Sequence, residues 1–322
     1  GLCSNRWTCS IDYFDTRTTD LLTDISLSGI GGYTNTITNG GETRNHGIEI
    51  LLSGNIIRNK NFNWNVTTAF TSYRNEIVKT GVTGVAGEQK NDIGRGRYVG
   101  TPINNIRTYV FDGIFQTDAD AINSAQGSLG GTITPFQNVA TLLAGAIRLK
   151  DVNGDGRIND DDQVIFATDP KWFSSISTTV SYKSFDLLAD LYFVEGTMKI
   201  NPYLSSFNEG GTLQSVRNGI KVDYWTPENP SNTFPRPNYS AAPANVSSLG
   251  LRESSYVRLR TLSLGYNMQN SLLDKMKLSG LRVYITASNL FTITDYKSYS
   301  PENNPNQFPD TKSFTFGLNI GL

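Results

Sequence analysis

Hydrophobic and polar residues alternate along most of this chain, a pattern typical of β-strands with one apolar and one polar face. The alternation is clearest in residues 61–74, 185–193, 281–289 and 313–322. Further candidate strands are residues 6–17, 45–57, 105–115, 172–183 and 254–268. Many of these nine segments have 10 to 15 residues, whereas strands of soluble proteins usually have about 5–6 and tilted membrane-crossing strands need about 9–11. The pattern therefore favours an all-β fold, an antiparallel transmembrane β-barrel.

The connections between these candidate strands are very unequal in length. Short turns are expected at residues 58–60 and 183–184. Long polar segments rich in Pro, Gly and Asn cover residues 80–104, 116–146, 196–254 and 295–311. Short turns on one side and long loops on the other are typical of bacterial outer-membrane barrels. We therefore expect the four long segments to be extracellular loops.

Composition is compatible with this fold and excludes some alternatives. Charged residues make up 18% of the 322 residues, below the quarter that is usual in soluble domains, and the net charge is −1. That balance provides no basic surface for nucleic acid. Continuous apolar runs are absent, and none approaches the 18 or more residues of a membrane-spanning helix. The mean hydropathy of −0.32 does not separate a soluble β protein from a barrel.

One segment has the residue spacing of a calcium-binding loop. Residues 151–162 fit the D-x-[DN]-x-[DN]-G pattern with an acid at position 12. Calcium takes six to eight oxygen ligands, which this loop would supply from Asp151, Asn153, Asp155, Arg157 (through its carbonyl), Asn159 and Asp162. Gly156 allows the sharp bend, and Ile158 can tie the loop to a neighbouring segment. We expect a structural calcium site; the alternative is an Asp/Asn-rich turn that holds only water.

The sequence lacks the residue combinations of common catalytic sites, so no enzyme is expected. His46 is the single histidine and is expected to be a packing or lumen residue. Cys3 and Cys9 would be roughly 20 Å apart on one extended strand, too far for a disulfide. The glycine-rich residues 94–97 lack the Lys-Ser/Thr and the helix of a phosphate loop.

Aromatic residues in two long loops are candidate contacts for a sugar or peptide ligand. They are Tyr224, Trp225, Phe234, Tyr239, Tyr296, Tyr299 and Phe308. The alternative for each is a structural role, in which it packs the loops together or belongs to the aromatic girdle of a barrel.

Two arginines constrain how one candidate strand is placed in a membrane. By simple alternation, Arg258 and Arg260 lie on the face that also carries Tyr256, Leu262 and Leu264. Because an arginine at the lipid midplane costs about 2–4 kcal/mol, we expect this section of strand at the membrane surface or outside it.

Several blocks of sequence resemble the C-terminal half of the SusC-like (RagA-like) TonB-dependent outer-membrane transporters of the Bacteroidetes. In the order of that family, they are residues 12–14 with 19–22, 45–49, 62–64, 149–156, 224–230, 256–260 with 264–266, 289–291 and 300–302. The resemblance runs nearly from end to end. It implies a 22-stranded barrel of which residues 1–322 supply the C-terminal portion, about ten strands, with the plug domain and signal peptide absent from this sequence.

The resemblance also implies a function and partners. It implies TonB-dependent import of oligosaccharide or peptide nutrients by a multi-pass protein of the cell outer membrane, surrounded by outer-membrane lipid. A SusD-like lipoprotein would capture substrate, and the TonB-ExbB-ExbD complex would act through the missing N-terminal region. Two alternatives stay open: an outer-membrane scaffold for surface lipoproteins or secretion machinery, and a secreted calcium-binding β-sandwich that binds carbohydrate.

Overall fold

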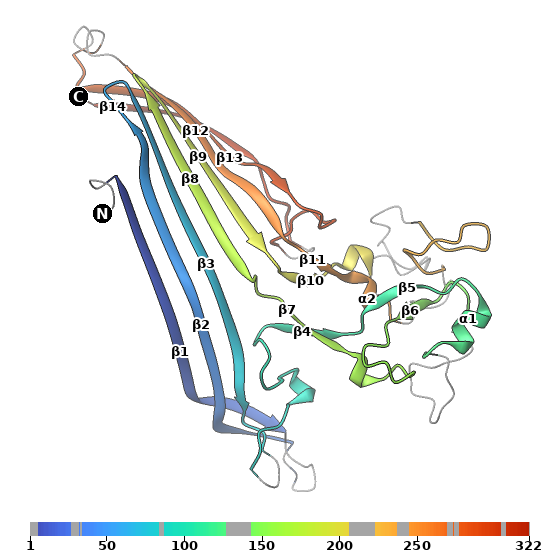
Figure 1. Ribbon diagram of the computed structural model, residues 1–322. Coiled ribbons are helices and arrows are strands. Elements are labelled where there is room, and N and C mark those ends of the chain that lie inside the picture. Colours follow the sequence, from blue (N-terminus) through green and yellow to red (C-terminus); the bar gives the residue numbers. More distant parts are fainter. Residues whose placement is uncertain are drawn as a thin grey trace.

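A computed structural model describes residues 6–26, 32, 34–83, 87–126, 143–205, 223–236, 245–268, 273, 277–303 and 307–321. Within these residues, the long strands form one antiparallel sheet in the order β1-β2-β3-β8-β9-β12-β13-β14, so strands that follow one another along the chain are neighbours (Figure 1). They are β1 (Trp7–Ser26), β2 (Asn35–Arg58), β3 (Phe62–Thr80), β8 (Trp172–Tyr182), β9 (Phe185–Glu195), β12 (Tyr256–Asn267), β13 (Gly280–Ile293) and β14 (Ser313–Gly321). A β-sandwich consists of two sheets packed face to face. One meandering sheet of long strands is instead the arrangement of a barrel wall.

One face of this sheet is apolar in continuous rows that cross the strands. Leu187 on β9 pairs with Val180 on β8 and with Leu264 on β12. Leu264 pairs with Ile285 on β13, and Ile285 with Phe316 on β14. Leu187, Leu264 and Phe316 are 38%, 47% and 79% exposed. An ordered apolar row that no part of the described chain covers fits a face that contacts hydrocarbon.

The opposite face carries polar side chains that bond to one another. Arg282 on β13 donates from Nη2 to Oδ2 of Asp186 on β9 at 2.5 Å, and Asn267 Nδ2 donates to Asp186 Oδ1 at 2.9 Å. The hydroxyls of Ser263 and Thr286 are 2.8 Å apart. We call this the polar face; it is the lumenal side of a barrel.

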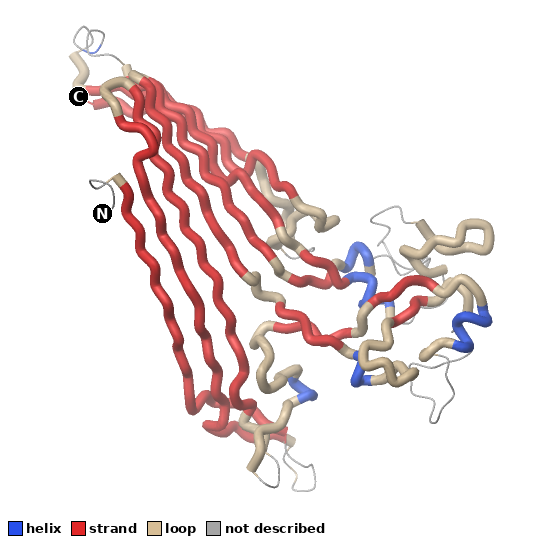
Figure 2. The backbone as a smooth tube through the Cα atoms, in the orientation of Figure 1, coloured by secondary structure: helices blue, strands red, loops and turns tan. Residues whose placement is uncertain are grey.

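Strands β1–β3 are much longer than the strands that follow them in the sheet. Strands β8, β9 and β12 have 11, 11 and 12 residues, close to the number needed to cross a membrane. Strands β1, β2 and β3 have 20, 24 and 19 residues and run well past the others, as Figure 2 shows. All three are thus longer than the sequence pattern predicts. Their additional length carries ion pairs such as Arg44 Nη2 to Asp15 Oδ2 at 2.6 Å.

The expected short turns are confirmed, and both lie at the same end of the sheet. Between β2 and β3, Asn59 Oδ1 accepts from the backbone N–H groups of Asn61 and Phe62 at 3.2 and 2.8 Å. Between β8 and β9, Lys183 adopts a positive φ of 52°. The long connections leave from the opposite end. No helix among the described residues is long and apolar enough to span a membrane.

The long loops contain secondary structure of their own. Residues 105–115, expected as one strand, form β4 (Asn105–Thr108) and β5 (Phe111–Ile114), because the chain changes partner between them: β4 pairs with β7 (Val164–Ala167) and β5 with β6 (Ile147–Leu149). The other short elements are β10 (Met198–Ile200) paired with β11 (Leu251–Glu253), α1 (Asp118–Asn123), α2 (Val246–Gly250), η2 (Ile93–Arg95), η3 (Asp160–Asp162) and η4 (Pro202–Leu204).

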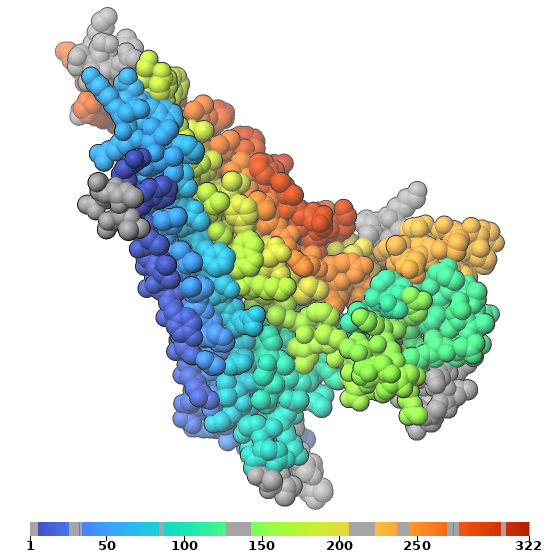
Figure 3. Space-filling view, viewed as in Figure 1, coloured from blue at the N-terminus to red at the C-terminus, as the bar shows by residue number. Residues whose placement is uncertain are grey.

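The main hydrophobic core lies in these loops and not in the sheet. It consists of Tyr109, Ile114, Ile147, Leu149, Ile158, Trp225 and Leu249, which are at most 8% exposed. Its members come from the connection between β3 and β8 and from the connection between β9 and β12. Figure 3 shows the two connections as one mass beside the end of the sheet. The two loops are therefore one folded unit.

Candidate functional site

Trp225 joins the two long loops. Its side chain is 8% exposed, and its indole Nε1 donates to Gln116 Oε1 at 3.0 Å. Its ring covers Gly145, where an added Cβ would lie 2.5 Å from Trp225 Cε3. Gly145 also has a φ of +83°, which favours glycine. Trp225 is thus part of the loop core, and little of its surface is open to a ligand.

The other candidate aromatic residues differ in how much surface they offer. Tyr296 is 4% exposed, whereas Tyr299 and Phe308 are 65% and 92% exposed. Tyr224 and Phe234 are half-buried and joined by a β-bridge, and Tyr239 lies outside the described residues. Tyr299 and Phe308, both between β13 and β14, are the most accessible members of the set.

Sequence reasoning missed Tyr203, which lies beside Tyr299. The two rings meet edge to face, with centroids 5.6 Å apart and planes at 87°. Asn201, fully buried in the same segment, accepts from the backbone N–H of Tyr203 at 3.0 Å. Its Nδ2 donates to the carbonyl of Lys297 at 2.8 Å. Because these residues are about 100 positions apart in the sequence, no local pattern could reveal the contact.

The loop 151–162 is wrapped around its own side-chain oxygens. The carboxylate of Asp151 accepts from the backbone N–H groups of Gly154 at 2.7 Å and Gly156 at 2.8 Å. Asn153 Oδ1 accepts from the N–H of Asp155 at 2.9 Å. Gly154 and Gly156 have φ values of +75° and +79°, which L side chains rarely adopt. The sequence pattern thus produces a tight loop with inward oxygens.

Two buried residues fix the far half of this loop. Asp162 is fully buried, and its two oxygens accept from the N–H groups of Val152 at 2.9 Å and Asn159 at 2.8 Å. Ile158, 4% exposed, belongs to the same loop core as Trp225. The expectation that Ile158 ties the loop to a neighbouring segment is therefore confirmed.

The donor set of this loop fits calcium in its chemistry and in its spacing along the sequence. Carboxylate and amide oxygens are hard ligands of the kind that calcium takes, and a carboxylate oxygen with one N–H partner keeps a further lone pair. Within the part of the chain that the structure describes, however, no three Asp, Glu, His or Cys side chains gather so that they could hold a metal ion. Binding would therefore need the loop to contract around the ion.

Arg258 and Arg260 are placed differently from what alternation predicts. A bulge between Leu259 and Thr261 shifts the register of β12 against both neighbours. Arg258 pairs with Tyr192 on the polar face, whereas Leu262 pairs with Ala189 on the apolar face. The prediction of a face shared with Leu262 and Leu264 is wrong, because one extra residue inverts the side-chain direction beyond it.

Arg258 is the centre of an ion-pair cluster. It is 5% exposed, and its Nη1 and Nη2 donate to Glu302 Oε2 at 2.8 Å and Asp310 Oδ2 at 2.5 Å. Its Nε donates to Thr292 Oγ1 at 3.0 Å. The ring of Tyr256 lies 5.0 Å from the guanidinium carbon. All three guanidinium nitrogens are therefore used within the chain.

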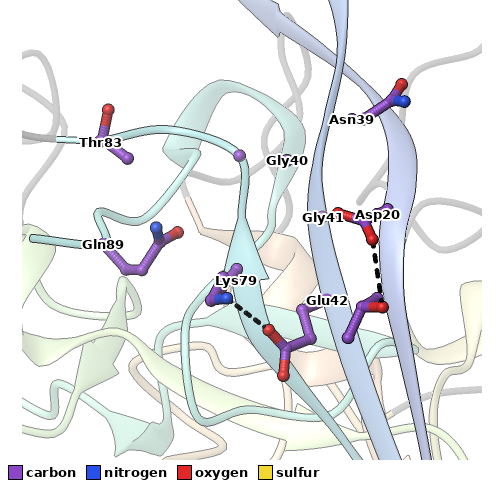
Figure 4. Close-up of a pocket in the computed structure, with 10 residues that line it drawn as sticks. Asp20, Asn39, Gly40, Gly41, Glu42, Lys79, Thr83 and Gln89 are labelled. Carbon is purple, nitrogen blue, oxygen red and sulfur yellow. Dashed lines mark hydrogen bonds and ion pairs between the residues drawn. The ribbon is translucent and has the colours of Figure 1, made fainter. Parts of the chain in front are cut away.

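A separate polar cavity of about 240 Å³ lies at the far ends of β1–β3 (Figure 4). Glu42, 3% exposed, accepts from Arg17 and from Lys79 Nζ, the latter at 2.6 Å. Asp20 borders the cavity with a φ of +55° at a bulge in β1. The buried carboxylate of Glu42 is already paired with two cations, one on β1 and one on β3. These ion pairs join the ends of the three strands.

His46 and the cysteines show no catalytic arrangement within the described residues. His46 is half-buried on β2 opposite Asp15 and shares a face with Ile48. It thus faces the apolar side of the sheet and not the lumen. Cys9 is exposed and unpaired, and Cys3 lies outside the described residues.

Comparison with known proteins gives sequence relatives along nearly the whole chain. TonB-dependent receptor P3 of Formosa agariphila is 28% identical over 346 residues, covering 99% of this chain and 33% of that protein. TonB-dependent receptor SusC of Bacteroides thetaiotaomicron is 24% identical, covering 99% of this chain and 30% of SusC. The chain thus spans about one third of the length of these relatives. No protein-family model matches it.

Solved structures share the fold. The structure of the RagAB peptide transporter superimposes with a TM-score of 0.73 at 24% identity, covering 99% of this chain and 34% of the other. The RagAB importer in its open-open state gives 0.73 at 23% identity. The eight-stranded sheet therefore matches a portion of a transporter barrel. Sequence and fold together relate this chain, along 99% of its length, to the C-terminal third of SusC-like TonB-dependent receptors.

Proposed function

We propose that this chain is part of a protein that imports oligosaccharide or peptide nutrients across the outer membrane in a TonB-dependent cycle. The observation that carries the proposal is the sheet itself, whose exposed apolar rows face one way and whose bonded polar residues face the other. The names of the relatives support it, since they are TonB-dependent receptors, among them SusC. None of these names describes an enzyme.

The edges of the sheet support a larger barrel. Within the described residues, β1 pairs only with β2, and β14 only with β13. An unpaired backbone group in hydrocarbon costs several kcal/mol, so both edges need further strands. We propose that they pair with the remaining strands of a 22-stranded barrel, embedded in outer-membrane lipid, that also holds a plug domain.

We propose the partners by analogy with the same relatives. A SusD-like surface lipoprotein would lie over the long loops, and the TonB-ExbB-ExbD complex would supply energy from the periplasmic side. The relatives do not decide between peptide and oligosaccharide as the substrate. The similar solved structure is named a peptide transporter, whereas the name of the SusC relative gives no substrate.

The test is uptake by cells that lack the gene. Deletion is expected to abolish import of either a tryptic digest of casein or malto-oligosaccharides, and the intact gene should restore it. Purification of the tagged full-length protein is expected to bring a surface lipoprotein with it. A lipoprotein partner with no loss of uptake for either probe would contradict import and favour the scaffold role.

We further propose that the loop 151–162 binds calcium as a structural ion. Asp151, Asn153, Asp155, Asn159 and Asp162 would supply side-chain oxygens, and Arg157 its carbonyl. Calcium would stabilise the loop that carries Ile158 and hence the core shared by the two long loops. It would take no part in transport chemistry.

A further inference from the structure

We propose that Arg258 is a positioning residue that holds the described parts of the β13–β14 loop, residues 294–303 and 307–312, as a fixed inward wall of the barrel mouth. In that position the loop presents Tyr299 and Phe308 to the transported solute. The attachment of the loop follows from the structure alone, whereas the contact with solute rests on the proposed import function.

The direction of the loop follows from the face on which Arg258 lies. Arg258 pairs with Tyr192 on β9 and with Thr292 on β13. Tyr192 lies six residues from Asp186, and β9 shows no register shift against β8, so the two side chains share the polar face. Because Glu302 and Asp310 reach Arg258 there, the loop folds over the lumenal side of the wall and not over the lipid side.

Arg258 holds both limbs of the loop at once. Glu302 belongs to the limb that leaves β13, and Asp310 to the limb that enters β14. The two carboxylates occupy different nitrogens of one guanidinium, at 2.8 and 2.5 Å. Asn303 Nδ2 also donates to Asp310 Oδ1 at 3.0 Å, which links the limbs directly. Charge-assisted bonds of this geometry are the strong class.

Strand β10 and the residue that follows it form a second attachment. Lys199 Nζ donates to the carbonyls of Pro301 and Glu302 at 2.7 and 2.6 Å, and burial lowers the pKa of Lys199. Asn201 Nδ2 holds the carbonyl of Lys297 at 2.8 Å. Inside the loop, Ser300 is 3% exposed. The loop is thus bound to the wall on one side and to the neighbouring loop on the other.

A loop fixed in this way holds its exposed aromatic rings in position before a ligand binds. Tyr299 is 65% exposed and rests edge-on against Tyr203, and Phe308 is 92% exposed. Aromatic rings on a rigid support lose little freedom when they bind a ligand, so they contact sugars or peptide side chains at low entropic cost. Without Arg258 the same rings would be carried by a loop that has lost its attachment to the barrel wall and keeps only the bonds from Lys199 and Asn201.

The first experiment measures loop opening independently of transport. The full-length protein in outer-membrane vesicles is treated with trypsin, and cleavage after Lys297 is followed by mass spectrometry. Replacing Arg258→Met is expected to raise the cleavage rate about tenfold, because cleavage follows local opening and the loop loses its central attachment. Arg258→Lys should lie between. Arg260→Met is the matched control, since Arg260 stacks on Tyr192 and contacts neither Glu302 nor Asp310.

The second experiment measures uptake kinetics of the casein digest and of malto-oligosaccharides. At equal amounts of folded barrel, Arg258→Met and Tyr299→Ala are each expected to raise KM about tenfold, and the double variant should raise it no further, because both act on one contact. Unchanged cleavage after Lys297 in Arg258→Met would overturn the attachment. Faster cleavage with an unchanged KM would overturn the positioning role. If the unaltered protein imports neither probe, the proposed function and the solute contact both fail, while trypsin still decides the attachment.

Discussion

Arg282 on β13 bonds to Asp186 on β9 across the strand that separates them. The Nη2–Oδ2 distance is 2.5 Å, and the Nε–Oδ1 distance is 3.3 Å. The intervening residue on β12 is Gly265, where an added Cβ would lie 2.5 Å from Arg282 Nη2 and 2.6 Å from Asp186 Oδ2. The ion pair therefore has room because position 265 of the strand beneath it carries no side chain.

Replacing Gly265→Val is expected to lower the free energy of unfolding by about 1–3 kcal/mol, since the charged groups lose their bonds. Valine suits a strand, so the loss comes from the separated ion pair. The temperature at which the folded band disappears on an unheated-versus-heated gel measures it. Gly280→Val is the control, because nothing lies within 4 Å of the Cβ added there. Equal unfolding temperatures for the two variants would disprove the role of Gly265.

Trp225 should stabilise the loop unit without affecting the barrel wall. Trp225→Ala removes a buried ring from the loop core, and such changes cost about 3–5 kcal/mol. We expect hydrogen exchange in β5 and β6 to accelerate while exchange in β9 and β12 stays slow. Phe308→Ala, which removes an exposed ring, should change neither. Retained protection of β5 and β6 in Trp225→Ala would show that the loops do not depend on this residue.

Tyr296 gives the β13–β14 loop a defined dependence on alkaline pH. Burial raises its pKa to about 12, from a usual value of 10.0. The folded loop prefers the neutral phenol, so this contribution to stability is fully present below pH 10 and is lost as the pH rises toward 12. Absorbance titration should find a tyrosinate signal near pH 12 that Tyr296→Phe removes. The same signal in that variant would assign it elsewhere.

The calcium proposal predicts a specific loss of binding. Asp151→Asn combined with Asp155→Asn removes two of the carboxylates, and we expect calcium affinity to fall at least about tenfold, because affinity follows the number of charged ligands. Isothermal titration of the detergent-purified full-length protein measures it. Asp161→Asn is the control, since Asp161 is exposed and outside the ligand set. Absence of calcium uptake at millimolar concentration in the unaltered protein would refute the site.

Local patterns were sufficient for the parts of the fold that depend on local rules. Strict alternation identifies β9 and β14, and the polar residues Asn59 and Lys183 mark the short turns. The wrapped first half of the loop at 151–162 also follows from spacing, because the oxygens of Asp151 and Asn153 reach N–H groups only two to five residues away. In each case the interacting residues are close in the sequence.

Contacts between distant segments were not predictable in this way. The bulge at Arg260 depends on how β12 pairs with both β9 and β13. Because of this bulge, Arg258 lies on the opposite face of the sheet from Leu262. The burial of Trp225 depends on Gln116, 109 positions away. The continuation of β1 and β2 past the membrane-length strands depends on pairing between polar segments, for which alternation of hydrophobic residues gives no signal.

We infer that this sheet is a membrane-embedded wall of a larger transport barrel. The most direct measurement is the intact mass of the outer-membrane band that contains this sequence, after detergent extraction and with its heat-modifiable migration recorded. We predict a heat-modifiable outer-membrane protein of about three times 35.5 kDa, because this chain covers about one third of its relatives. A 35.5 kDa protein that begins at Gly1 and is soluble without detergent would contradict the membrane-embedded wall.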